Sequence, residues 1–337
     1  MNVIVTGVAG FIGMHAAARL LERGDRVIGV DDLNPYPDPV LKQARLERLQ
    51  GRGGFSFERT DMADASAMES LFDRTAPGLV LHLAARPGVR ESLDHPQACV
   101  TANVTGFLQV LEGCRRHGVG HLVYASSSSV YGTNTRLPFE ESQAADHPVS
   151  IYAATKRADE LLAHAYSEAF RLPITGARLF TVYGPWGRSD MAVYRFTRAI
   201  LENRPLDIYN EGQLVRDFTY VDDVVAALLE LLDKPATPSH RFGRAHPDPA
   251  ESDAPHRVFN VGGGQAVPLL EFVALLEQVL GRAARRRYLP MQSGDVHATQ
   301  ACCDRLHSWT GWQPQTTLED GLRRFAEWFC DYHGVAR

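Results

Sequence analysis

The sequence has no long hydrophobic run and no strong excess of charge of either sign, and each absence excludes a class of protein. No window approaches the roughly 20 apolar residues that a membrane-spanning helix needs. The 35 Lys and Arg side chains against 40 Asp and Glu give a net charge of −5, which argues against a nucleic-acid or anionic membrane surface as the main partner. Small molecules and other proteins remain as partners.

Metal binding and secretion have no support in the sequence either. Cysteine occurs five times, without metal-ligand spacing, and the adjacent Cys302 and Cys303 do not have the spacing of a pair of zinc ligands. We therefore expect free thiols and no metal. The chain opens on the strand-like "MNVIVTGVAGFIG", with no basic segment or cleavable apolar stretch before it. These features predict a cytoplasmic protein.

Short apolar runs alternate with longer amphipathic stretches through the first half of the chain. The strand-like runs are "NVIVTG", "RVIGVDD", "FSFERTDM", "LVLHLAA", "HLVYASSSS" and "PITGARLF". This rhythm predicts a parallel sheet with helices on both faces, the doubly wound α/β fold of Rossmann type.

The second half predicts a smaller α/β domain. The Pro-, Asp- and Ser-rich segment 234–256 is expected to be disordered or an insertion, "RVFNVGGG" to be a returning strand, and "VPLLEFVALLEQVL" and "LEDGLRRFAEWFCDYH" to be helices. A chain of 337 residues is long enough for two such units. We expect the Rossmann domain at 1–179 and the smaller domain at 180–337, with parts of 215–235 and 256–264 returning to the first.

The first chemical motif is "TGVAGFIG", in which Gly7, Gly10 and Gly13 lie between a strand and a helix. A side chain at these positions would keep the backbone away from a pyrophosphate, to which the helix N-terminus offers free N–H groups and partial positive charge. After the next strand, Asp31 and Asp32 can accept hydrogen bonds from an adenosine ribose and would repel a 2′-phosphate. The pattern predicts NAD rather than NADP. The alternative is a tight turn with two incidental acids.

The second motif is "YAATK", which places Tyr152 and Lys156 four residues apart on one face of a predicted helix. A tyrosine of ordinary pKa, about 10, is a poor base at neutral pH, but a lysine ammonium and the nicotinamide cation both favour the phenolate. Such a tyrosine can take a proton from an alcohol while a hydride leaves the same carbon. Alone the pair is common on surface helices, but together with the glycine turn it indicates redox chemistry on an alcohol.

With both motifs in place, the chain resembles the extended branch of the short-chain dehydrogenase/reductase family over almost its whole length. The resemblance rests on "TGVAGFIG", on "HLAA" at 82–85, on "SSSSVYG" from Ser126 and on "YAATK". It implies an NAD domain followed by a sugar-nucleotide domain, a homodimer formed through paired helices, and Tyr152, Lys156, Ser127 and Ser129 as the catalytic group. It implies cofactor contacts for Gly7, Gly10, Phe11, Ile12, Gly13, Asp31, Asp32, Asp61, Met62, Leu83, Ala84, Ala85, Asn103, Ser126, Tyr152 and Lys156. His82, on an apolar strand, is expected to be a core residue.

The residues before the valine-tyrosine of "SSSSVYG" separate two reactions within this branch. The 4,6-dehydratases that the chain resembles carry an Asp-Glu pair there, which supplies the acid and base for water elimination. Here Ser128 and Ser129 stand at those positions. The remaining group supports hydride removal and return, which is what a 4-epimerase needs.

The loop "TVYGPWGRSDMA", with "AARPGVRES" and "GQLVRDFTYVDD", is similar to UDP-glucuronate 4-epimerases more than to neutral-sugar epimerases. The resemblance implies that Thr181 and Arg188 hold the sugar carboxylate, since a guanidinium is a planar, permanently charged fork. Oxidation at C4 makes a β-keto acid, so clamping its carboxylate suppresses decarboxylation. Arg90 is a further candidate near the nicotinamide, or else a surface arginine.

At the nucleotide end, Arg216 matches a phosphate-binding arginine of the family and Asp295 an acid that contacts the uridine ribose. Gln292 replaces a second phosphate arginine of the neutral-sugar enzymes, and Arg86 is a further departure. The sequence thus predicts a UDP-glucuronate 4-epimerase with tightly held NAD. The alternatives are a UDP-glucose/UDP-galactose 4-epimerase or a UDP-glucuronate decarboxylase on the same scaffold, and a silent NAD-binding scaffold protein, against which the intact catalytic group argues.

Overall fold

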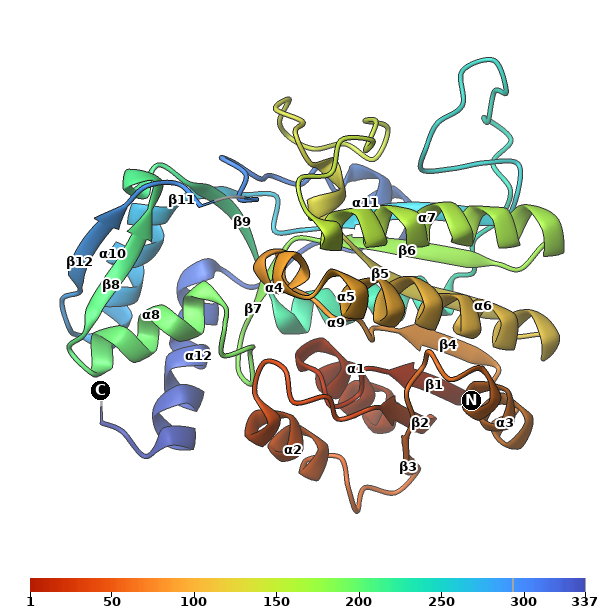
Figure 1. The fold of residues 1–337 in the computed structure, drawn as a ribbon, viewed down its shortest axis with the longest axis horizontal. Coiled ribbons are helices and arrows are strands. Elements are labelled where there is room, and N and C mark those ends of the chain that lie inside the picture. The colour runs from red at the N-terminus through yellow and green to blue at the C-terminus, as the bar shows by residue number, and fades with distance from the viewer. Residues whose placement is uncertain (293, 337) are drawn as a thin grey trace.

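A seven-stranded sheet forms the centre of the molecule in the computed structural model, which describes residues 1–292 and 294–336 (Figure 1). The strand order is β3-β2-β1-β4-β5-β6-β10, and every neighbouring pair is parallel. These strands are β1 (Asn2–Thr6), β2 (Arg26–Asp31), β3 (Phe55–Arg59), β4 (Leu79–His82), β5 (His121–Ser127), β6 (Ile174–Leu179) and β10 (His256–Val261). The predicted doubly wound parallel sheet of Rossmann type is confirmed, and the six strand-like runs of the first half coincide with β1 to β6.

Alternate side chains of the strands point to opposite faces of the sheet and build two core clusters. On one face, Ile4 and Val80 pack in a cluster with side chains of α3, α6 and α7, and on the other Val3 and Val123 pack with α1 and α9. The helices around this sheet are α1 (Phe11–Glu22), α2 (Pro39–Glu47), α3 (Ala65–Thr75), α4 (Val89–Asp94), α5 (Pro96–Val100), α6 (Gly106–Arg116), α7 (Ile151–Phe170) and α9 (Val221–Asp233), with single turns at η1 (Thr101–Thr105) and η2 (Ser128–Tyr131). Because helices cover both faces of the sheet, the strand sequences are continuous apolar runs.

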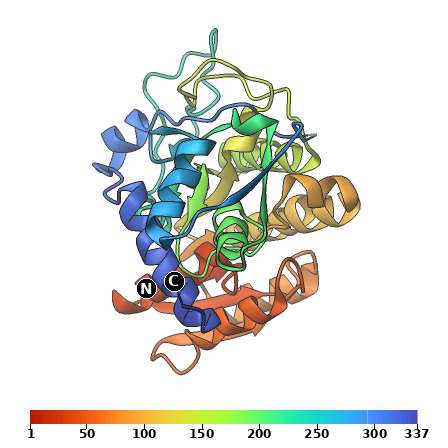
Figure 2. The same cartoon turned by 90° about the vertical axis from the view of Figure 1, so that its left-hand side faces the viewer.

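The rest of the chain forms a smaller part that lies to the left of the sheet in Figure 1 and faces the viewer in Figure 2. It contains a three-stranded sheet in the order β11-β9-β7 and a parallel pair of β12 with β8. Its elements are β7 (Thr181–Tyr183), α8 (Ala192–Leu201), β8 (Pro205–Tyr209), η3 (Asn210–Gly212), β9 (Val215–Tyr220), β11 (Ala266–Pro268), α10 (Leu269–Leu280), β12 (Arg285–Leu289) and α12 (Leu318–His333). The helix α11 (Asp304–Thr310) lies instead against β10 of the large sheet. The two expected helices correspond to α10 and α12.

The segment 234–256 is a folded loop rather than a disordered one. It has no helix or regular strand, but Ala250 and Ala254 are buried, and Arg305 of α11 donates to Asp248 at 2.7 Å. It projects as the teal loop at the upper right of Figure 1. The ion pair with Arg305 and a backbone hydrogen bond from Val258 of β10 to Ala250, at 2.8 Å, therefore fasten it to α11 and β10. Within the described residues, no helix is both long and apolar enough to cross a membrane.

Candidate active site

The glycine turn between β1 and α1 leaves a cradle that side chains would fill. Gly7 adopts a left-handed φ of 69°, and a Cβ there would lie 2.8 Å from the backbone of Ala84. A Cβ on Gly13 would lie 2.1 Å from the carbonyl oxygen of Gly7. At the start of α1, Gly10 provides no side-chain cap, so the first N–H groups of Phe11, Ile12 and Gly13 remain available to an anion. The turn fits the pyrophosphate of a dinucleotide.

The two acids after β2 differ in their surroundings. Asp31 is buried, and its carboxylate accepts from the backbone N–H of Ala9 at 3.1 Å and of Leu33 at 2.9 Å. The ammonium of Lys42 lies 3.3 Å from Asp31 and 3.8 Å from Asp32. The Asp32 side chain is 43% exposed, which leaves it open to a ribose. Asp31 ties the glycine turn to β2, and both acids border the end of the sheet where the cradle lies.

The remaining predicted cofactor positions lie on neighbouring strand ends. Thr6 accepts with its hydroxyl from the backbone N–H groups of Leu83 and Ala84 at 3.1 and 3.2 Å, which fixes the start of the loop that continues through Ala85. The Asp61 carboxylate accepts from the Ala63 N–H. Met62 packs near Gly106 on α6, where an added Cβ would lie 3.4 Å away.

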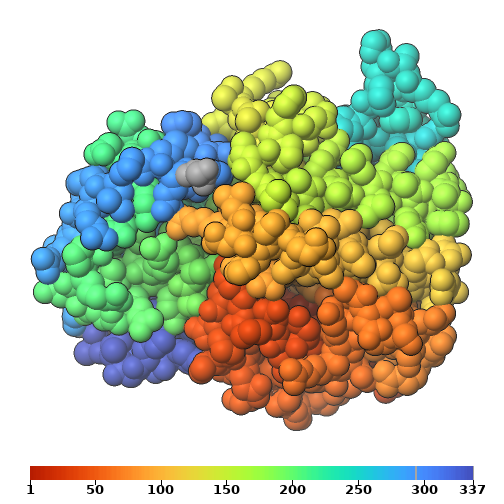
Figure 3. All heavy atoms as spheres, viewed as in Figure 1, coloured from red at the N-terminus to blue at the C-terminus, as the bar shows by residue number. Residues whose placement is uncertain are grey.

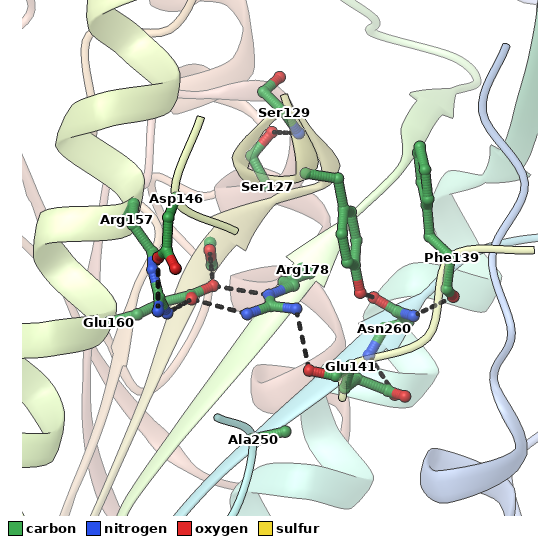
Figure 4. Close-up of polar contacts among 12 residues, drawn as sticks. Ser127, Ser129, Phe139, Glu141, Asp146, Arg157, Glu160, Arg178, Ala250 and Asn260 are labelled. Atoms are coloured by element: carbon green, nitrogen blue, oxygen red, sulfur yellow. Dashed lines mark hydrogen bonds and ion pairs between the residues drawn. The ribbon is translucent and has the colours of Figure 1, made fainter. Parts of the chain in front are cut away.

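Ser126 and His82 point into the interior of the molecule. The Ser126 hydroxyl donates to Glu160 at 2.6 Å, in the network where Arg178 donates to both Glu160 oxygens at 2.8 and 2.9 Å (Figure 4). Any contact of Ser126 with a cofactor therefore uses its main chain. His82 is buried, bonds through Nδ1 to Thr6 at 2.8 Å and stacks on Phe107; burial and the charge of Lys156 lower its pKa to about 3. It is neutral and buried at ordinary pH, as expected for a core residue.

The catalytic candidates come from the end of β5 and the first turns of α7, which packs against η2. Ser127 ends β5, and its hydroxyl accepts from the Ser129 N–H at 3.2 Å as η2 begins (Figure 4). Tyr152 lies in the first turn of α7, which begins at Ile151 because the Ser150 hydroxyl caps the Ala153 N–H at 3.1 Å. Lys156 follows one turn later. The predicted Tyr-Lys pair thus lies on one helix, as its spacing required.

Lys156 is buried and shares its charge with a carboxylate that the sequence analysis did not select. Its ammonium donates to Asp159 at 3.1 Å, and the two side chains are 2% and 0% exposed. Burial raises the pKa of Asp159 to about 6, against the opposing effect of Lys156. The spacing of three residues on one helix is the signal that could have indicated this pair.

Asn103 links the cofactor side of the sheet to the catalytic turn. Its amide donates to the Thr155 hydroxyl at 2.9 Å, and that hydroxyl donates to the Tyr152 carbonyl at 2.8 Å. Its carbonyl accepts from the Arg86 N–H at 2.7 Å. Asn103 lies in the π-turn η1, a distortion frequent at functional sites. Its amide therefore positions the Tyr152 backbone.

Thr181 at the start of β7 and Arg188 in the loop after it line one small cleft, together with Met191 and Phe218. The Arg188 guanidinium makes a two-bond contact with Asp190, at 3.0 and 2.6 Å, and Tyr36 donates to the same carboxylate at 3.1 Å. The pKa of Arg188 is raised: burial opposes the rise, while Asp190, Tyr36 and the nearby phenol of Tyr152 favour it. An orienting carboxylate thus holds the predicted acid-binding arginine within electrostatic reach of Tyr152. Asp190 and Tyr36 had no sequence signal beyond their place in loops.

The structure explains Arg86 and gives Arg90 a partner in the smaller part of the molecule. Arg86 donates to Glu91 at 3.1 and 2.7 Å, and its guanidinium lies 5.9 Å from the Tyr36 ring centroid. It closes the cluster around Asp190 from the side of α4. Arg90 is exposed, with its guanidinium 5.4 Å from the ring centroid of Tyr209 at the end of β8. This contact links the two parts of the molecule, and the role of Arg90 near the nicotinamide stays a prediction.

The nucleotide-end candidates lie together in the smaller part. Arg216 on β9 donates to the carbonyls of Val215 and His297, at 2.9 and 3.2 Å. Burial lowers its pKa, and the neighbouring Asp295 works against that shift. This pair lies on the segments that border the N-terminal part, whose red-to-yellow spheres meet the green and blue ones in Figure 3. The site thus runs along the junction of the two parts.

The fold and this geometry define a class of protein. The chain belongs to the NAD dependent epimerase/dehydratase family, whose model matches residues 3–262. The resemblance found in the motifs is confirmed.

Particular relatives agree with the finer resemblance. A probable UDP-glucuronate 4-epimerase of Rhizobium meliloti is 44% identical over 330 residues, which cover 98% of this chain and 97% of the relative. UDP-glucuronate 4-epimerase 1 of Arabidopsis thaliana is 43% identical, over 99% of this chain and 78% of the relative. The crystal structure of UDP-glucuronic acid 4-epimerase from Bacillus cereus, in complex with UDP-glucuronic acid and NAD, is similar with a TM-score of 0.87 at 31% identity, covering 98% of this chain and 100% of that one.

Proposed function

We propose that this chain is an NAD-dependent UDP-glucuronate 4-epimerase, which interconverts UDP-glucuronate and UDP-galacturonate. The observation that carries the proposal is the placement of Arg188, in one cleft with Thr181 and within electrostatic reach of Tyr152. A fixed cation beside the phenol suits a sugar whose carboxylate lies next to the reacting carbon. The same placement disfavours a neutral-sugar epimerase and a silent scaffold.

The chain's own residues account for the proton transfers. Tyr152 takes the proton of the C4 hydroxyl and later returns it, while the Lys156 ammonium favours the phenolate. Ser127 and Ser129 hydrogen-bond the reacting oxygen. Bound NAD would supply the redox chemistry, which is reversible hydride transfer at C4 of the sugar. The cradle at Gly7 and the two acids after β2 would hold the cofactor.

The carboxylate grip decides the product. The 4-keto sugar is a β-keto acid, which loses carbon dioxide when the bond to its carboxylate aligns with the ketone π system. Thr181 and Arg188 would hold the carboxylate near the ketone plane, where that alignment is lost. Asp190 and Tyr36 restrict the Arg188 rotamer, so the grip is preorganised. Epimerisation then outcompetes decarboxylation.

The remaining assignments follow the same proposal. Arg216 would bind a UDP phosphate and Asp295 the uridine ribose. Residues 1–179 would form the NAD domain and 180–337 the sugar-nucleotide domain; in support of a return to the first domain, β10 pairs with β6 and α9 packs on α1. A cytoplasmic homodimer is part of the proposal, and the exposed apolar side chains Val100, Leu161 and Phe170 on and near α7 support such a contact.

The direct test is to incubate the purified chain with UDP-glucuronate, without added NAD, and to follow the sugar protons by NMR. UDP-galacturonate is the expected product, formed by cofactor that co-purifies with the chain. A UDP-pentose with released carbon dioxide would identify a decarboxylase instead. Turnover of UDP-glucose alone would identify a neutral-sugar epimerase and refute the role given to Arg188.

A further inference from the structure

Three consecutive carbonyls of the loop after β7 are bound by side chains from the N-terminal part of the molecule. His15 of α1 donates through Nε2 to the Pro185 carbonyl at 3.0 Å. Arg45 of α2 donates through Nε to the Trp186 carbonyl at 2.9 Å and through Nη2 to the Gly187 carbonyl at 3.0 Å. Arg188 is the next residue of the chain. The segment that leads into the proposed carboxylate grip is therefore fastened at its backbone.

The backbone of this loop adopts a conformation that needs such fastening. Trp186 has a φ of 64°, in the left-handed region that bulky residues avoid. Its ring contacts Trp328 and Tyr332 of α12, with centroids 5.3 and 5.1 Å away, and the Arg48 guanidinium lies 4.8 Å from its centroid. The ring is thus held from α12 and α2, and the carbonyl is held by Arg45. The contacts of its ring and the hydrogen bond to its carbonyl together keep Trp186 in the left-handed conformation, which it would not hold by itself.

Arg45 is almost fully buried, at 2% exposure, and it differs from the buried Arg178, which is paired with Glu160. Among the described residues, its hydrogen bonds go to the two loop carbonyls and it makes no ion pair with a carboxylate. Burial, with the nearby charge of Arg188, lowers its pKa to about 10, so it remains a cation at neutral pH. A buried cation is costly to fold around, and its planar fork here matches two adjacent carbonyls.

We propose that Arg45 is a positioning residue for the carboxylate grip: its two bonds to the loop carbonyls hold Trp186 in the left-handed conformation and thereby set Arg188 and Asp190 beside Tyr152. This inference rests on the proposed function. Without the two bonds the loop relaxes at Trp186, and Arg188 loses its fixed direction. Binding of the acidic sugar then weakens and its carboxylate rotates more freely, whereas the nucleotide end and the cofactor site are untouched.

The test compares Arg45→Met and Arg45→Lys with a matched control, Arg52→Met, an arginine near α2 whose hydrogen bond goes to Glu22 instead of the loop. In a Tyr152→Phe background, which prevents turnover, calorimetry gives the affinities for UDP and for UDP-glucuronate, and the bound NAD is quantified after denaturation. In the active background, NMR gives the fraction of turnovers that end in decarboxylated product. Thermal melting of each variant checks folding.

For Arg45→Met we expect UDP-glucuronate to bind about tenfold or more weakly, since two buried hydrogen bonds are lost. UDP affinity and NAD content should stay unchanged, and the decarboxylated fraction should rise. Arg45→Lys keeps the charge but not the planar fork, so its affinity for UDP-glucuronate should lie between those of Arg45→Met and the parent. The affinity of Arg52→Met should match that of the parent. Two results in a folded Arg45→Met variant would overturn the inference: parent-like affinities for both UDP-glucuronate and UDP, or an equal loss of both affinities. Failure of the proposed function appears separately, as no UDP-galacturonate from the parent chain.

Discussion

Tyr152 lies in the first turn of α7, within electrostatic reach of Arg188, and this placement sets what a single substitution should do. Tyr152→Phe removes the hydroxyl that exchanges the proton with C4 while leaving the ring in place. We expect turnover of UDP-glucuronate to fall by about a thousandfold or more, as for the loss of a general acid–base group. Bound NAD, measured by absorbance after denaturation, should be unchanged. Normal activity in this variant would refute the assignment of Tyr152.

Arg188→Ala tests the grip itself. Loss of the guanidinium should raise the KM for UDP-glucuronate about tenfold or more, because the proposed charge-assisted contact with the sugar carboxylate is removed. Decarboxylated pentose product should appear in the NMR spectrum. Arg136→Ala, at an arginine whose side chain is 82% exposed, is the control and should behave as the parent. If Arg188→Ala changes neither the KM nor the product, the loop is only a turn.

The buried pair of Lys156 and Asp159 predicts a pH effect. Burial raises the pKa of Asp159 to about 6, so above that pH the carboxylate is ionised and shares the lysine charge, with Glu160 as the next acid nearby. In Asp159→Asn the Lys156 charge acts undivided on Tyr152, which favours the phenolate. We expect the acidic limb of the kcat/KM profile to move to lower pH. Asp331→Asn, at an exposed position of α12, should leave the limb in place; the same limb in both variants would contradict this role.

At the scale of elements, Glu160 joins α7 to β6 through Arg178 and also accepts from Arg157 at 3.0 Å (Figure 4). Although burial opposes it, Arg178 with its hydrogen bonds lowers the pKa of Glu160 to about 2. The native state therefore binds fewer protons than the unfolded state between about pH 4.3 and 2. Stability from this group is present above that window and is lost as the pH falls through it.

The corresponding measurement is urea unfolding at several pH values. For the parent, Glu160 should contribute about 3 kcal/mol to the free energy of unfolding at pH 7, and this contribution should vanish toward pH 2. Glu160→Gln should be less stable at pH 7 and should show a flatter decline below pH 4.5. An equally steep decline in the variant would mean that other carboxylates cause the acid sensitivity.

Elements with a clear apolar period could be predicted from the sequence, and elements set by distant contacts could not. The strands β1 to β6 and the helix α12 follow their apolar patterns. The basic run 282–288 overlaps the strand β12, which forms through parallel pairing with β8 although its local pattern is weak. Tyr152 and Lys156 could be predicted as a pair because they are four residues apart on one helix. Arg45 lies on an amphipathic helix, and its bonds reach carbonyls 141 and 142 residues away, so nothing near it in the sequence marks it.

At the scale of the whole molecule, the proposed homodimer makes Leu161 a test position. Its side chain is 58% exposed on the outer face of α7, and burial of such a residue favours association. Leu161→Glu should convert the particle measured by light scattering from a dimer to a monomer. Val40→Glu, at an equally apolar position that is 70% exposed on α2, is the matched control and should leave the mass unchanged. A dimer that persists in Leu161→Glu would place the contact elsewhere.

The bonds from α2 to the loop after β7 also bear on how such enzymes can be recombined. A hybrid made by joining the N-terminal half of one family member to the C-terminal half of another would inherit the loop from one parent and its anchor from the other. Where the donor of the N-terminal half lacks an arginine at position 45, the loop would arrive without the two donors that hold Trp186 and Gly187. If Arg45 positions the carboxylate grip as proposed, substrate choice depends on residues of both halves, and exchanging the sugar-binding half alone would not transfer it.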